Sequence, residues 1–134
     1  MAGGGGTGGG RRKWRDGTGL LAVPGREEPV RTVIAASYRS RRRGLLGRDG
    51  IEGAAMLLTP CGSVHTFGMR FAIDVAYLDR GLRVLDVVTM APGRLGRPRL
   101  RARHVLEAEA GALAGWGVGP GVRLSVTEGP GRAG

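Results

Sequence analysis

The chain contains very little cysteine, few aromatic residues and almost no lysine. Cys61 is the single cysteine among 134 residues, which excludes an internal disulfide and favours a reducing compartment. No apolar run approaches the roughly 20 residues that a membrane-spanning helix needs. A secretory signal needs about 7–15 apolar residues after its basic segment, whereas only LLAV precedes Pro24 here. We therefore expect a cytoplasmic protein with no membrane association.

The charge is strongly basic and comes almost entirely from arginine. The formal net charge is +10, and Lys13 is the one lysine among 21 basic residues. Segments 39–48 and 94–103 each carry five arginines, a pattern that suits nucleic acid or another anionic partner. Nucleic-acid readers usually add aromatic side chains that stack on bases, and Tyr38, next to Arg39, is the one aromatic residue at these two basic clusters. Nucleic-acid binding is therefore an alternative and not the leading hypothesis.

Glycine marks both ends of the expected folded region. Residues 1–18 are mostly glycine followed by basic residues, and they offer only Trp14 for burial, so we expect a disordered tail. Residues 128–134 are similar in composition, and the same expectation applies. We expect residues 19–127 to form a single domain, about the length at which a small domain folds alone.

Strand and turn signals between the tails predict a mainly β fold. Apolar or alternating runs occur at residues 19–23, 30–36, 53–60, 71–79, 82–90, 103–111 and 122–126. Short helices are expected from the Ser37 cap to Gly47 and at residues 112–116. Because no βαβ alternation is present, we predict an α+β, mainly β fold. It would have six or seven short, largely antiparallel strands, curled into a small barrel or half-barrel, with one or two short helices.

The segment 91–102 has no periodicity. It reads APGRLGRPRLRA, a mixture of proline, glycine and arginine without a regular apolar spacing. Such composition predicts an exposed loop.

Five motifs occur along the chain in a recognisable order. They are RGLLGR at 43–48, AAMLL at 54–58, HTFGMRFAIDVAYLD at 65–79, the hairpin to VLDVV, and HVLEAEAG at 104–111. Together they resemble the DUF192 family of uncharacterised small bacterial and archaeal proteins, in a shorter HTFxMRFxID variant. The resemblance covers about residues 30–126 and implies a compact, β-rich α+β domain with no established activity. The recurring polar positions of the family correspond here to His65, Met69, Asp74 and Glu107.

Asp74 and Glu107 are the most informative candidates because both lie within expected strands. Asp74 shares a strand face with Ala76 and Leu78, and burying its charge costs several kcal/mol unless a partner is present. A structural alternative is an ion pair with Arg70, or hydrogen bonds to a helix start or to backbone N–H groups. Sequence spacing does not show whether Asp74 and Glu107 meet.

The leading hypothesis is a small, non-catalytic ligand-binding or partner-binding domain, whose ligand is an unknown small molecule or protein. Its cleft would lie at one end of the curved sheet, lined by His65, Thr66, Met69, Arg70, Asp74 and Glu107. The alternative from another class is an acid–base enzyme, hydrolase or lyase-like, that uses Asp74, Glu107 and His65.

Metal and thiol chemistry have weaker support. Cys61, His65, His104 and Asp74 could together provide four zinc ligands, but the paired CxxC or HxxxH spacing of zinc sites is absent. A nucleophilic Cys61 would need a histidine base and a third orienting group. We therefore expect no metal and no cofactor.

Overall fold

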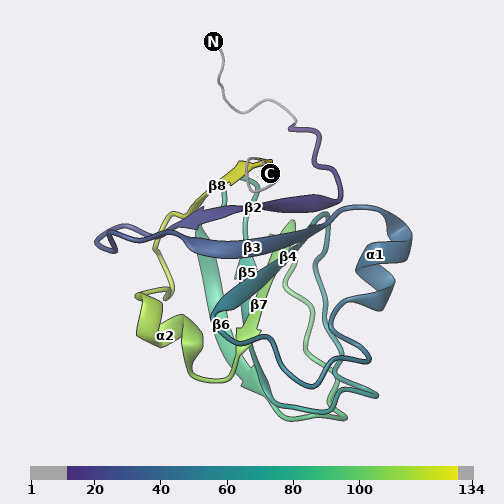
Figure 1. Ribbon diagram of the computed structural model, residues 1–134. Coiled ribbons are helices and arrows are strands. Elements are labelled where there is room, and N and C mark those ends of the chain that lie inside the picture. Colours follow the sequence, from purple (N-terminus) through teal and green to yellow (C-terminus); the bar gives the residue numbers. More distant parts are fainter. Residues whose placement is uncertain (1–11, 130–134) are drawn as a thin grey trace.

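Seven strands and two short helices make up the computed structural model, which describes residues 12–129 (Figure 1). The strands are β2 (Gly17–Ala22), β3 (Val30–Ala35), β4 (Ala54–Leu58), β5 (Ile73–Leu78), β6 (Val84–Met90), β7 (His104–Glu109) and β8 (Ser125–Glu128). The helices are α1 (Tyr38–Arg43) and α2 (Ala112–Trp116). Neither helix is long and apolar enough to cross a membrane. The mainly β, α+β fold class predicted from the sequence is confirmed.

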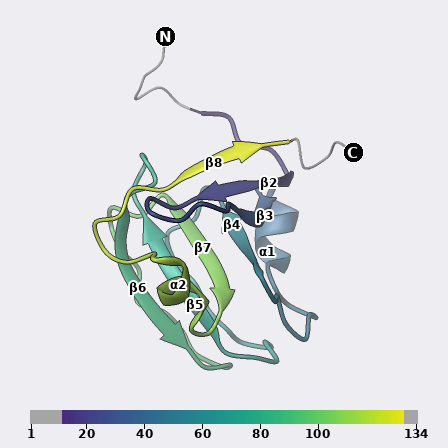
Figure 2. The ribbon, with the colours of Figure 1, turned by 60° about the vertical axis from the view of Figure 1, so that its left-hand side comes forward.

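The strands form one mixed sheet in the order β6-β5-β7-β4-β3-β2-β8. All neighbouring pairs are antiparallel except β3 and β4, which are parallel and are connected through α1. Figures 1 and 2 show the sheet bending so that β2 and β3 lie across the direction of β5 and β6. The sheet does not close on itself, which corresponds to the predicted half-barrel.

The segment from Gly121 to Glu128 contacts both ends of this strand order. The backbone N–H of Val84, at the start of β6, donates to the carbonyl of Val122 at 2.8 Å, and Gly121 donates back to Val84 at 2.8 Å. Strand β8 follows directly and pairs with β2 at the opposite end of the sheet. Residues 121–124 therefore cover part of the β6 edge of the sheet, and the strand that follows them, β8, forms the opposite edge.

Strand alternation divides the apolar side chains into two clusters on opposite faces of the sheet. One cluster, here called the α2 face, includes Leu57, Ala76 and Leu106 from the sheet and Leu113 from α2. Figure 2 shows α2 lying against this part of the sheet. The other cluster, the loop face, is covered by the connecting segments of the chain. It includes Met56, Leu58, Val64, Ile73, Val75, Tyr77, Met90 and Val105.

Helix α1 is shorter than predicted. Ser37 caps it as expected, because its hydroxyl oxygen accepts from the backbone N–H of Ser40 at 3.1 Å. The helix ends at Gly44, which has φ of 47°, and not at Gly47. Gly44 can adopt this positive φ without the strain that a β-carbon would cause, so it stops the helix one turn early.

The chain ends also differ from the expected boundaries. Strand β2 begins at Gly17, within the predicted tail, and Asp16 accepts backbone hydrogen bonds from Ala36 at 2.6 Å and Ser37 at 2.8 Å. These bonds hold the pKa of Asp16 well below its ordinary value. Strand β8 was expected at 122–126 and occupies Ser125–Glu128 instead. The disorder predicted for residues 1–11 and 130–134 lies outside the described residues.

Candidate functional site

Asp74 is buried on the α2 face, where three donors satisfy its carboxylate. One oxygen accepts from the hydroxyl of Thr89 at 2.6 Å. The other accepts from the backbone N–H groups of Gly111 at 2.9 Å and Leu113 at 3.2 Å, at the start of α2. These contacts match the structural alternative raised from the sequence, in which Asp74 anchors a helix start. The carboxylate therefore fixes α2 against the sheet.

Glu107 lies on the neighbouring strand but points to the opposite face. Residues that pair directly across an antiparallel ladder share a face. Val75 of β5 pairs with Glu107, whereas Asp74 pairs with Ala108. The expectation that both carboxylates line one cleft is therefore wrong. The pairing of β5 with β7 would have to shift by one residue to bring Asp74 and Glu107 onto the same face of the sheet. The two groups cannot serve as acid and base in a single site.

The carboxyl group of Glu107 is buried without a hydrogen-bond donor among residues 12–129. Glu107 is 6% exposed, and burial raises its pKa to about 7. Its charge acts on Cys61, whose half-buried thiol also has a raised pKa, mainly because of burial. A raised pKa leaves little thiolate at neutral pH, which does not suit a nucleophilic cysteine. Within the described residues, no three His, Cys, Asp or Glu side chains gather to hold a metal ion.

The remaining predicted residues lie on the loop between β4 and β5. His65 is exposed and stacks on Phe67 with ring centroids 5.1 Å apart, and it makes no hydrogen bond or ion pair with Asp74 or Glu107. Arg70 is exposed and pairs with Asp49 at 2.8 Å. Met69 packs partly buried against the loop-face cluster. The six predicted residues thus do not converge on one cleft.

Thr66 is the member of this group that connects two segments of the chain. Its buried hydroxyl donates to the carbonyl of Ala91 at 2.6 Å and accepts from the backbone N–H of Arg94 at 2.8 Å. Nearby, the N–H of Gly96 donates to the carbonyl of Val64 at 2.7 Å. The arginine-rich loop 91–103 is therefore held against residues 61–66 by a series of hydrogen bonds.

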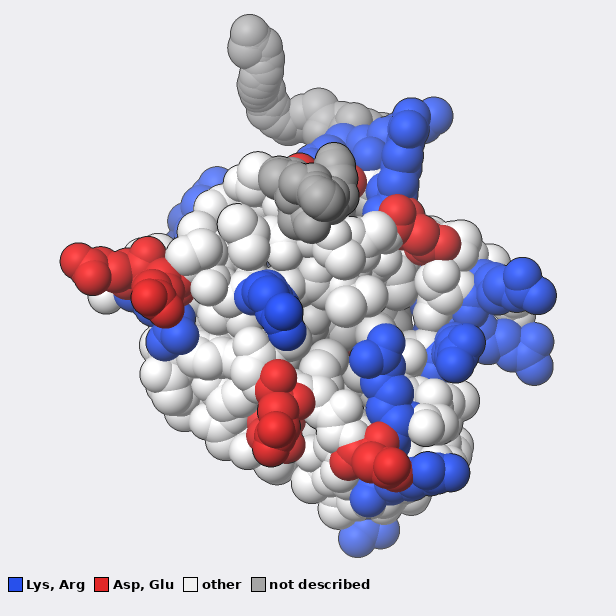
Figure 3. Space-filling model, viewed as in Figure 1, with Lys and Arg blue, Asp and Glu red and all other residues white. Residues whose placement is uncertain are grey.

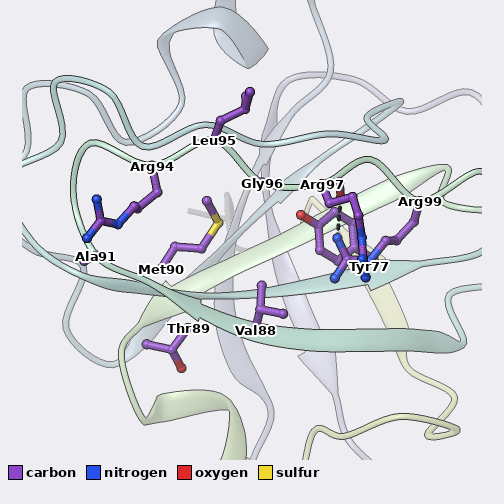
Figure 4. A pocket seen from close by; sticks show the side chains of 10 residues that line it. All are labelled: Tyr77, Val88, Thr89, Met90, Ala91, Arg94, Leu95, Gly96, Arg97 and Arg99. Carbon is purple, nitrogen blue, oxygen red and sulfur yellow. Dashed lines mark hydrogen bonds between the residues drawn. The ribbon is translucent and has the colours of Figure 1, made fainter.

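A cleft of about 460 Å³ opens between this loop and strand β6 (Figure 4). Tyr77, Val88 and Met90 line it from the sheet, and Arg94, Gly96, Arg97 and Arg99 line it from the loop. Gly96 makes the close approach possible, because a β-carbon there would lie 2.8 Å from the Tyr77 hydroxyl and 2.9 Å from the carbonyl of Val64. The cleft thus combines an apolar floor with three guanidinium groups.

The polar groups of the cleft are unevenly satisfied. Arg99 pairs with Asp86 at 2.6 Å and lies over the ring of Tyr77, 4.2 Å from its centroid. Neither Arg94 nor Arg97 has a carboxylate within ion-pair distance among the residues that the structure describes. The hydroxyl of Tyr77 is buried and has no hydrogen-bond partner within residues 12–129, and Figure 4 shows its oxygen directed toward Met90. Burial raises the pKa of Tyr77, so this hydroxyl stays protonated.

Sequence reasoning missed this cleft. None of Tyr77, Arg94, Arg97 or Arg99 was among the predicted site residues. The available signal was the run of five arginines without an acidic residue in segment 94–103. That signal could have indicated an anion site, but not the strand that faces it.

Comparisons with known proteins agree with the resemblance seen in the motifs. The model of the DUF192 family (Uncharacterized ACR) matches residues 20–126. The chain is 45% identical over 83 residues to a UPF0127 protein of Pyrococcus horikoshii, a match covering 58% of this chain and 71% of the relative. It is 36% identical over 110 residues to a UPF0127 protein of Pyrococcus furiosus, covering 78% and 94% respectively.

A solved structure shares the fold at low sequence identity. The crystal structure of a proposed transcription regulator from Sinorhizobium meliloti superposes with a TM-score of 0.70 at 19% identity. The superposition covers 87% of this chain and 98% of that chain, so nearly the whole fold is common to both. The family match and the curated relatives lead to one conclusion: this chain belongs to the DUF192 family.

Proposed function

We propose that this protein binds a small anionic molecule, without catalysis, in the cleft between β6 and loop 91–103. The observation that carries the proposal is a cleft in which, among the described residues, Arg94 and Arg97 have no carboxylate partner and the buried hydroxyl of Tyr77 has no hydrogen-bond partner. A buried hydroxyl without a partner is costly, and a ligand oxygen would supply one once the atoms of Gly96 that cover the hydroxyl shift aside. Arg94 and Arg97 would attract the negative charge and donate further hydrogen bonds.

The size and chemistry of the cleft support binding over acid–base catalysis. Its volume of about 460 Å³ falls in the range of small-molecule pockets. Val88 and Met90 provide apolar contact. The guanidinium and phenol groups that line it all donate hydrogen bonds at neutral pH, and Asp86, the nearby carboxylate, is engaged by Arg99. Such a set recognises an anion but offers no free base.

The test is thermal stabilisation of the full chain by a panel of anions, beginning with inorganic phosphate and small carboxylates. Ligands that fill the cleft should raise the melting temperature, and added sodium chloride should weaken the effect. In the variant Arg97→Gln, the rise in melting temperature caused by the ligand should be mostly lost. Arg31→Gln is the matched control, because Arg31 is an exposed arginine on β3 with no part in the cleft. An equal loss in both variants, or no shift with any anion, would refute the proposal.

The six residues selected from the sequence stay a separate prediction as ligand contacts. The positions of Thr66 and His65 support an indirect role, since Thr66 binds the backbone of Arg94 and His65 pairs with Leu95. Both would then shape the loop without touching the ligand.

A second candidate, nucleic-acid binding, has one observation in its favour. Tyr38 is 70% exposed at the start of α1, beside the exposed Arg39, Arg42 and Arg43. Figure 3 shows basic side chains gathered over α1, with few acidic neighbours. Stacking of a base on Tyr38 would add to phosphate contacts by these arginines.

The experiment for this candidate is a titration with a single-stranded oligonucleotide at several salt concentrations. Tyr38→Ala should weaken binding several-fold, and affinity should fall steeply with salt. Phe67→Ala is the control, because Phe67 is an exposed aromatic residue on a different loop. Equal weakening by both variants would argue against an α1 surface.

A further inference from the structure

We infer that the ligand of the cleft carries two acidic groups, one for each end, joined by an apolar middle. This inference rests on the proposed function and names the ligand class. Figure 4 shows Arg94 at one end of the cleft, near Ala91, and Arg97 with Arg99 at the other end, near Tyr77. Val88 and Met90 lie between the two ends.

The positive charge at each end of the cleft matches one negative charge on the ligand. The ligand would therefore carry two singly charged groups and not one doubly charged group. Arg99 is already paired with Asp86 at 2.6 Å, so it brings little net charge to its end of the cleft. Arg97 then contributes one uncompensated positive charge there, and Arg94 contributes one at the opposite end. A carboxylate matches each of these, because the guanidinium fork can donate two parallel hydrogen bonds to it.

The middle of the cleft favours methylene groups. Met90 is buried and Val88 is half-buried, and both side chains face the cleft in Figure 4. The side chain of Leu95 is directed away from β6 in the same view. The backbone of Gly96 lies close to this floor, since a β-carbon there would lie 3.4 Å from the Met90 methyl group. An apolar spacer would therefore be desolvated between two charged ends.

An extended peptide pairing with the edge of β6 is the less suitable ligand. The backbone N–H of Val87 donates to the side chain of Asp86 at 2.9 Å, which removes a donor that an added strand would need. At the other end of the strand, Val84 is already paired with the segment after Gly119. A small α,ω-dicarboxylate avoids both obstacles.

The experiment is isothermal titration calorimetry of the full chain with α,ω-dicarboxylates of increasing length. Each is compared with the monocarboxylate of the same length, and inorganic phosphate is titrated in parallel. At one preferred length, the dicarboxylate should bind about tenfold or more tightly than the monocarboxylate, because a second charge-assisted contact forms. Arg94→Gln should reduce the dicarboxylate to the affinity of the monocarboxylate. Arg31→Gln should change neither.

The outcomes separate this inference from the proposed function. Equal affinity for the two ligand types, or tight binding of phosphate alone, would overturn the inference and leave the anion cleft standing. Equal weakening of both ligand types by Arg94→Gln would also overturn it. Absence of binding by every carboxylate and by phosphate would overturn both.

Discussion

The two faces of the β5–β7 pair hold a carboxylate in contrasting ways. On the α2 face, Asp74 accepts from one hydroxyl and two backbone N–H groups. On the loop face, Glu107 has no donor among residues 12–129, and the Tyr77 hydroxyl and the Arg41 Nε are buried without partners. Satisfied polar groups stabilise a fold, whereas unsatisfied ones cost stability and commonly mark function. The contrast supports the proposed cleft, which lies on the loop face.

The largest expected effect comes from removing the satisfied carboxylate. Asp74→Ala would leave three donors without their acceptor, among them the buried backbone N–H of Leu113, so we expect a loss of about 3 kcal/mol in the free energy of unfolding. Urea unfolding followed by tryptophan fluorescence measures this, since Trp116 lies in α2. Thr89→Val, which removes one of the three donors, should cost about 1 kcal/mol. Similar small losses in both variants would contradict the anchoring role of Asp74.

Replacing Glu107 should raise the free energy of unfolding, whereas replacing Asp74 lowers it. The gain from replacing Glu107 depends on pH. The pKa of Glu107 is about 7 in the folded protein and near 4.5 ordinarily. Between these values the folded state binds more protons than the unfolded state, so stability falls as pH rises. The contribution amounts to about 2 kcal/mol between pH 5 and pH 8.

Urea unfolding of Glu107→Gln across this pH range isolates that contribution. The variant should match the original chain near pH 5 and exceed its stability by about 2 kcal/mol at pH 8. Subtracting the two profiles removes the contributions of other groups such as His104 and Asp86, whose pKa values are also shifted. A constant difference at all pH values would show that Glu107 does not titrate in this range.

Closing the cleft should have a smaller effect on stability. Gly96→Ala places a methyl group against the Tyr77 hydroxyl and the Val64 carbonyl, so we expect a loss of about 1.5 kcal/mol. Gly119→Ala is a matched control, because a methyl group there would have no atom within 4 Å beyond its chain neighbours. Thermal melts of both variants check this, and anion binding should disappear in Gly96→Ala alone.

The smallest expected effect is a gain in stability. Tyr77→Phe removes a buried hydroxyl that has no partner, so the free energy of unfolding should rise by about 0.5 kcal/mol. The same variant should bind anions less tightly, because a donor in the cleft is lost. A clear loss of stability would indicate that the hydroxyl is satisfied in solution.

Local features of the fold could be predicted from the sequence. The strands near residues 19–23 and 30–36, the Ser37 cap and the alternation that places Asp74 with Ala76 and Leu78 all follow from neighbouring residues, and the structure confirms them. The ordered motifs were also sufficient for the DUF192 resemblance, which the family match confirms. These features depend on spacing within one segment.

The arrangement of the candidate site depends on pairing between distant segments. Whether Asp74 and Glu107 share a face is decided by the register of β5 against β7, and a shift of one residue reverses the answer. The cleft depends on backbone bonds between Gly96 and Val64 and between Arg94 and Thr66, which any sequence of suitable length could make. Neither arrangement leaves a pattern in the residues themselves.

The C-terminal stretch has a consequence for the order of events during synthesis. Residues 121–124 pair with the chain around the start of β6, and β8 then completes the sheet beside β2. Until this stretch has left the ribosome, the edges of β6 and β2, which are far apart in the sequence, remain unpaired. Either edge can then pair with another chain. A product that terminates before Gly121 would expose both edges at once, and self-association is its expected fate.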